Sequence, residues 1–146
     1  MSAAPWFSVR AAFITVLTVF AWLFLQLIYG YWWQQRTMDV TVVEGAVGLW
    51  GLEVLIALPD LVYFLVVGGV LYYVSGPNRT VVWPVLSALT AMVIKALWTQ
   101  YTFLEPSFVD AGILLVSYGF PVLCAIAGAF AAKTVLARMP DGRAET

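Results

Sequence analysis

Two acidic residues lie within a stretch of sequence that is long and apolar enough to cross a bilayer. Glu53 and Asp60 fall in the run 51–74, and their spacing of seven residues is close to two helical turns. A charge at the centre of a membrane helix costs roughly 2.5–3.5 kcal/mol, whereas each Leu, Ile, Val or Phe returns about 0.3–0.6 kcal/mol. Charges kept at that cost usually face a bundle interior and mark a site. We therefore expect both carboxyl groups to project from one helical face toward other helices.

These residue types favour two kinds of chemistry, and Glu53 and Asp60 are the catalytic candidates. A carboxyl group at low dielectric can hold its proton near neutral pH and donate it to a carbon–carbon double bond, with Trp22 or Trp98 stabilising the carbocation. An ionised carboxylate would equally bind an amphiphilic amine without reaction. Lys95 cannot fully compensate two carboxylates, so we expect at least one to be protonated. The structural alternative is that Lys95 pairs with one of them only to neutralise the bundle.

Polar and aromatic side chains from all four apolar segments are expected to line one pocket. On the first segment they recur every three or four residues, which places them in one helical stripe: Thr15, Thr18, Trp22, Gln26, Tyr29 and Trp33. An apolar pocket with a few convergent polar groups is the usual profile of a ligand site. The predicted ligand-binding residues are Trp22, Gln26, Lys95, Trp98, Ser117 and Tyr118.

The composition places the chain among membrane proteins and excludes several kinds of site. Of its 146 residues 63% are hydrophobic, against about 45–50% in soluble domains. The chain has no histidine and a single cysteine, Cys124. It therefore has no internal disulfide, no His-ligated metal or haem and no imidazole proton shuttle, and we expect neither a metal nor a cofactor. Without a basic cluster, nucleic acid is not an expected partner.

We predict a single all-α domain over residues 1–146, a four-helix antiparallel transmembrane bundle. The expected helices are about 9–33, 46–74, 81–101 and 110–136, followed by a loose tail at 138–146. Pro59 and Pro121 should kink the second and fourth helices. Two sets of small residues predict close helix contact: Gly68 with Gly69, and the ridge formed by Cys124, Gly128 and Ala132.

The distribution of basic residues predicts the orientation of the bundle. Five of them fall on one side of the predicted spans: Arg10, Arg79, Lys133, Arg138 and Arg143. Only Arg36 falls on the other side, so the positive-inside rule puts both termini in the cytoplasm. The expected location is a bacterial inner membrane or the endoplasmic reticulum membrane. At about 1.5 Å per residue, Glu53 and Lys95 should lie at similar depths and Asp60 near the midplane.

Three stretches resemble the emopamil-binding-protein-related (EXPERA) family of four-span membrane proteins. They are the segment Glu53-Val-Leu-Ile-Ala-Leu-Pro59, the turn Asn78-Arg79-Thr80, and Val116-Ser117-Tyr118-Gly119-Phe120-Pro121. The resemblance covers about 51–138 and implies a lipophilic ligand pocket in which Glu53 is the buried glutamate. The family's first-helix aspartate has no match, and Gln26 is the nearest candidate. The essential histidine of the family's sterol isomerase is absent, and Lys95 is an unexpected addition.

Our first hypothesis is a small membrane protein that binds a sterol- or isoprenoid-like ligand within the bundle, with acid-catalysed isomerisation or cyclisation as a further option. Its expected partners are the lipid bilayer and that hydrophobic small molecule. Two alternatives stay open. The chain could be an accessory or assembly subunit of a larger membrane complex, or a proton- or cation-coupled transporter using Glu53, Asp60 and Lys95, which would need a homodimer to form a path.

Overall fold

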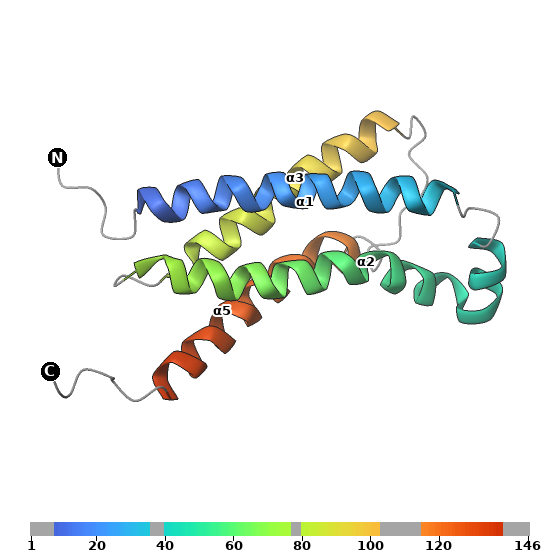
Figure 1. Ribbon diagram of the computed structural model, residues 1–146. Helices are drawn as coiled ribbons and strands as arrows, with labels where there is room; N and C mark the ends of the chain where they lie inside the picture. Colours follow the sequence, from blue (N-terminus) through green and yellow to red (C-terminus); the bar gives the residue numbers. More distant parts are fainter. Residues whose placement is uncertain (1–7, 36–39, 77–79, 103–114, 139–146) are drawn as a thin grey trace, which may run out of the picture.

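The protein is almost entirely helical in the part of the chain that its computed structural model describes, which is residues 8–35, 40–76, 80–102 and 115–138 (Figure 1). Side chains are described in these ranges except at 30–35, 40–53, 55 and 99–102. The helices are α1 (Val9–Gln35), α2 (Val40–Val74), α3 (Val82–Thr102) and α5 (Phe120–Arg138). A π-helical turn, η3 (Leu115–Gly119), runs directly into α5. The prediction of an all-helical fold is confirmed for these residues.

Three of the helices are long and apolar enough to cross a membrane. The stretches that meet both conditions are Val9–Tyr29, Ile56–Val74 and Leu115–Arg138. The apolar part of α3, Val82–Trp98, is shorter. A bilayer core about 30 Å thick needs about 20 apolar residues in a helix. The described residues therefore support three of the four predicted spans by length and composition, and α3 falls slightly short.

The helix bounds differ from the predicted ones mainly at the start of α2. The predicted second helix begins at about 46, whereas α2 begins at Val40 and continues to Val74. Val and Thr have modest helix propensity, which is a weak bias that helical context overrides. The predicted fourth helix begins at 110, whereas the described part begins at Leu115. Residues 110–114 and 139–146, including the predicted loose tail, lie outside the described residues.

The helices pair in two groups. α2 makes its most extensive contact with α5, and α1 makes its most extensive contact with α3, while contact between α1 and α2 is sparse. α5 crosses α2 obliquely, and the start of α1 lies toward the same end of the molecule as the end of α5 (Figure 1). The α1–α2 side of the bundle is therefore the loosely packed side.

Glycines bring the backbones of α2 and α5 into direct contact. A Cβ atom on Gly68 would lie 2.0 Å from the carbonyl oxygen of Ala125, and one on Gly128 would lie 1.9 Å from the carbonyl oxygen of Leu65. No side chain fits at such distances, so only glycine permits this crossing. The predicted role of Gly68 and Gly128 in close helix contact is confirmed. Ala132 lies near Gly69, at 3.8 Å from the position of a Cβ there.

The buried side chains form two small clusters between the helices, and much of the apolar surface faces outward. The larger cluster contains Trp22, Phe64, Ala88, Ala91, Met92 and Ala125. The second contains Ala11, Val67, Leu71 and Trp83. On α1 the side chains of Phe13, Phe20 and Phe24 are each more than 60% exposed. An outward apolar surface of this extent is stable in lipid and a liability in water.

Replacing Gly68 by Ala should destabilise the bundle, whereas the same change at the adjacent Gly69 should not. The Gly68→Ala methyl would overlap the Ala125 carbonyl, and overpacking of this kind costs about 1–3 kcal/mol. A Cβ at Gly69 would lie 3.4 Å from the nearest atom, and alanine gains about 1 kcal/mol in helix propensity over glycine. Equilibrium unfolding in SDS would measure both free energies. Equal effects of the two substitutions would contradict the close crossing.

Candidate functional site

Asp60 is the buried centre of the site. It follows Pro59 on α2, and its exposed fraction is 2%. Ala57 and Phe64, three residues before it and four after it, are also buried, at 1% and 0%. Since residues three and four apart share a helical face, Asp60 lies on the inward face of α2. This inward projection is what the cost of an intramembrane carboxyl group predicts.

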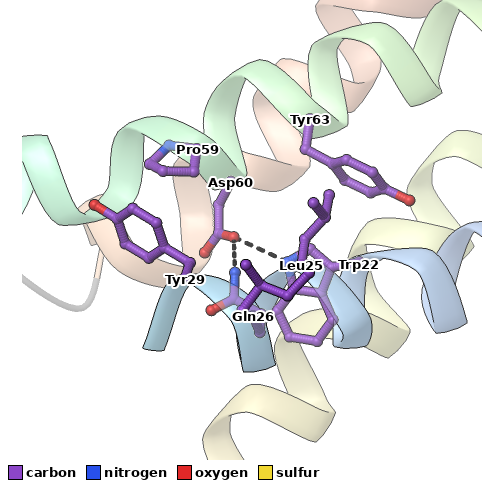
Figure 2. Close-up of a pocket in the computed structure, with 8 residues that line it drawn as sticks. Trp22, Leu25, Gln26, Tyr29, Pro59, Asp60 and Tyr63 are labelled. Atoms are coloured by element: carbon purple, nitrogen blue, oxygen red, sulfur yellow. Dashed lines mark hydrogen bonds between the residues drawn. The ribbon is translucent and has the colours of Figure 1, made fainter. Parts of the chain in front are cut away.

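Two side chains of α1 donate hydrogen bonds to one oxygen of Asp60. The indole Nε1 of Trp22 donates to Oδ1 at 2.9 Å, and the amide Nε2 of Gln26 donates to the same oxygen (Figure 2). Trp22 and Gln26 are four residues apart, so both point from the same face of α1. Trp22 is only 2% exposed, and its ring packs against Phe64 with centroids 6.3 Å apart. The carboxyl group of Asp60 therefore joins α1 to α2.

Lys95 of α3 binds the other oxygen of Asp60. Its Nζ donates to Oδ2 at 2.7 Å, which is a typical length for a charge-assisted hydrogen bond. The side chain of Lys95 is 22% exposed and that of Asp60 is 3% exposed. Lys95 thus pairs with Asp60, one of the two carboxyl groups that the sequence offered it, and the side chain of the other, Glu53, lies outside the described residues. The long lysine stem lets the ammonium group reach Asp60 from its own helix.

The ammonium group of Lys95 also lies against the π-helical turn before α5. Its Nζ is 3.5 Å from the carbonyl oxygen of Ser117 and 5.7 Å from the ring centroid of Tyr118. Pro121 has no N–H, so it cannot donate to the carbonyl oxygen four residues before it, which is that of Ser117. The lysine approaches the acceptor whose usual helical donor the proline removes. Asp60 and Lys95 thus connect α2, α3 and η3.

A cavity of about 240 Å³ lies beside Asp60, between α1 and α2 (Figure 2). Its walls are mostly apolar and aromatic, and they comprise Trp22, Leu25, Gln26, Ile28, Tyr29, Pro59, Asp60 and Tyr63. Leu25 and Ile28 are 47% and 52% exposed, so the cavity opens to the outside between the two helices. Asp60 and Gln26 are the carboxyl and amide side chains among these lining residues.

The structure brings four of the predicted site residues into direct contact, and the others contact Lys95, do not line the cavity or are not described. Trp22, Gln26 and Lys95 all bond Asp60. Ser117 contributes its backbone carbonyl and Tyr118 its ring, both to Lys95 and not to the cavity beside Asp60. Trp98 is 66% exposed and is not among the residues that line this cavity. The side chain of Glu53, the other predicted catalytic group, lies outside the described residues.

The sequence analysis missed Tyr63, which lines the cavity and connects α2 to α1. Its hydroxyl donates a hydrogen bond to the backbone carbonyl of Thr18. The hydroxyl groups of Thr18 and Ser87 are hydrogen-bonded to each other at 3.0 Å. This links α2, α1 and α3 about one turn from Asp60. A signal for Tyr63 was present, because it lies three residues after Asp60 and therefore on the same helical face. Ser87 lies eight residues before Lys95 on the corresponding face of α3.

The arrangement favours an ionised carboxylate at Asp60. An ionised carboxylate accepts hydrogen bonds at both oxygens, and here three donors, one of them an ammonium group, point at them. A group so engaged is suited to holding a polar ligand in place and poorly suited to giving a proton to a hydrocarbon. Among the described residues, no group of three or more His, Cys, Asp or Glu could hold a metal ion.

Breaking the ion pair from one side should cost more than removing it from both sides. Lys95→Gln leaves the carboxylate of Asp60 uncompensated, which should lower the free energy of unfolding by about 3 kcal/mol or more. The double variant Asp60→Asn/Lys95→Gln should lose less than the sum of the single losses. SDS unfolding of the wild type, Asp60→Asn, Lys95→Gln and the double variant measures this coupling. Lys133→Gln, at an exposed lysine of α5, is the control and should change little; additive losses would show that the pair is not coupled.

Comparison with protein-family models, with curated proteins and with solved structures finds no match to this chain.

Proposed function

We propose that the chain is an integral membrane protein that binds a hydrophobic, sterol- or isoprenoid-like ligand in the cavity between α1 and α2. The observation that carries this proposal is the cavity itself, which has apolar and aromatic walls and a polar group, Asp60, at one place. Ligand sites commonly combine apolar walls with a small number of placed polar groups. In this proposal, the polar end of the ligand lies at Asp60 and Gln26, and its hydrocarbon contacts Leu25, Ile28 and Tyr29.

The size and the opening of the cavity support a ligand that is only partly enclosed. At about 240 Å³ it is smaller than the roughly 300–1,000 Å³ common for sites that enclose a drug-sized molecule. Because Leu25 and Ile28 are about half exposed, a chain could extend from the cavity into the surrounding lipid. A ligand arriving through the bilayer would then enter sideways, between α1 and α2, without crossing water.

The proposal is one of binding and does not include isomerase or cyclase chemistry. Both oxygens of Asp60 already accept hydrogen bonds, one of them from Lys95. Protonating a double bond needs a carboxylic acid whose proton points at the substrate. We also propose, from the sequence resemblance alone, that the chain is related to the EXPERA family. Gln26, the nearest residue to that family's first-helix aspartate, lies in the cavity wall and bonds Asp60.

We further propose that the start of α1 and the end of α5 face the cytoplasm. Arg10, Lys133 and Arg138 are exposed at or near these ends, and basic residues collect on the cytoplasmic side of membrane proteins. The end of α3, at Thr102, would then face the opposite side.

Cysteine labelling tests this orientation, because Cys124 is the only cysteine and Cys124→Ser removes it. In that background, Ala137→Cys should react with a membrane-impermeant maleimide only when the cytoplasmic face is exposed, as in inverted vesicles. Thr102→Cys should react in intact cells. The Cys124→Ser protein alone is the control and should not react in either preparation. The reverse pattern of labelling would show that the bundle is inserted the other way.

Filling the cavity should remove the bound ligand. Leu25→Trp places an indole in the wall of the cavity, whereas Leu27→Trp makes the same change at an outward-facing leucine that is 63% exposed. After gentle extraction, mass spectrometry should find a hydrophobic small molecule retained by the wild type and by Leu27→Trp. Leu25→Trp should retain at least about tenfold less of it, corresponding to about 1.4 kcal/mol of binding free energy.

Two results would contradict the proposed function. One is the same set of retained lipids in all three proteins, which would mean that the cavity binds nothing selectively. The other is purification with a stoichiometric partner protein whose removal leaves no retained ligand. That result would favour an accessory subunit of a larger membrane complex.

A further inference from the structure

The charge of Asp60 is already balanced within the protein. Its Oδ2 accepts from the ammonium group of Lys95 at 2.7 Å, and both residues belong to the described bundle interior. A membrane cavity with a bare carboxylate would attract a lipophilic cation, because the ligand would supply the missing positive charge. Here a cationic ligand at Asp60 would place a second positive charge beside Lys95, separated from it by one carboxyl group. The site therefore gives a cation much less electrostatic stabilisation than a bare carboxylate would, too little to offset the loss of the cation's hydration.

Lys95 balances this charge without occupying the cavity. It reaches Asp60 from α3 and is not among the residues that line the space between α1 and α2. Its ammonium group is held on that side by the carbonyl oxygen of Ser117 at 3.5 Å and the ring of Tyr118 at 5.7 Å. The negative electrostatic field of the carboxylate is thus reduced, while the cavity stays open.

Hydrogen-bonding capacity remains at the cavity wall after all these contacts are made. A carboxylate offers about four lone-pair positions, and the described residues supply three donors to Asp60. Within the described part of the chain, the amide oxygen of Gln26 accepts no hydrogen bond, and only one N–H of that amide donates one. A hydroxyl group could donate to an oxygen of Asp60 or Gln26 and accept from the second amide N–H.

We propose that Lys95 sets the charge selectivity of the cavity, so that the cavity binds an uncharged amphiphile bearing a hydroxyl group in preference to lipophilic cations. This inference rests on the proposed function, because it concerns the ligand of the same cavity. Lys95 acts through Asp60 and does not touch the ligand, so it is a positioning residue. Its effect is to change the class of ligand and not merely the strength of binding.

A matched pair of probes tests the selectivity. Farnesol and farnesylamine have the same hydrocarbon, and they differ in carrying a neutral hydroxyl group or an amine that is protonated at neutral pH. Binding of each tritiated probe is measured to the full chain in nanodiscs of zwitterionic lipid, with empty nanodiscs as background. The wild type should bind farnesol at least about tenfold more tightly than farnesylamine. Equal binding, or a preference for the amine, overturns the proposal.

Two substitutions of Lys95 test its role through the preference between the two probes. A purely structural role of Lys95 would leave that preference unchanged. Lys95→Gln removes the internal positive charge, so the preference should reverse and farnesylamine should bind more tightly than farnesol. Lys95→Arg keeps the charge and should keep the wild-type preference. If Lys95→Gln is unfolded and binds neither probe, the wild type and Lys95→Arg decide the test. Both of these proteins must then bind farnesol more tightly than farnesylamine.

The failure of this inference can be distinguished from that of the proposed function. If the wild type binds both probes equally and Leu25→Trp abolishes both, the cavity is a ligand site and only the charge selectivity is wrong. If the wild type binds neither probe above empty nanodiscs, and Leu25→Trp retains the same lipids as the wild type, the proposed function fails and the selectivity fails with it.

Discussion

The structure depends on one electrostatic constraint, which is that a carboxyl group buried in an apolar bundle must be compensated by its neighbours. Asp60 is 2% exposed, and the described residues meet its needs from two other helices: hydrogen bonds from α1 and an ammonium group from α3. The cost of burying a charge is offset only when partners and geometry are both in place. The position of α1 and α3 around α2 is therefore tied to the carboxyl group of Asp60.

Pro121 acts through the backbone acceptor whose usual helical donor it removes. Pro121 cannot donate to the carbonyl oxygen of Ser117, and the ammonium group of Lys95 approaches that oxygen at 3.5 Å. The π-helical turn Leu115–Gly119 lies directly before Pro121, where the hydrogen-bond register must change. Pro59, next to Asp60, lies in the cavity wall. Helix irregularities in membranes are tolerated where polar groups satisfy the freed backbone, and the π-helical turn lies against the ammonium group of Lys95.

The cavity exists because α2 packs closely on one side and loosely on the other. Gly68 and Gly128 let the backbones of α2 and α5 touch, so no space remains on that side. Between α1 and α2 the contact is made by long side chains, including Trp22 and Tyr63, and these hold the backbones apart. An apolar space with a polar group on its wall remains between them.

The sequence by itself determined the class of the fold and the residues with unusual chemistry. Apolar runs of membrane length predict helices from local composition, and the cost of a buried charge singles out Asp60 and Lys95 wherever they lie in space. The helical stripe of α1 correctly brought Trp22 and Gln26 to one face, because helical periodicity is a local property.

Only the tertiary structure decided that Lys95 pairs with Asp60, and where the open space lies. Sequence spacing placed Lys95 at the depth of Glu53 and left open which carboxyl group it would reach, whereas the structure brings its ammonium group to Asp60. The roles of Tyr63 and of the Ser117 carbonyl arise from contacts between segments far apart in the chain. Helical periodicity describes the face of each helix, but not the neighbour that the face meets, because that neighbour is set by packing across the whole bundle.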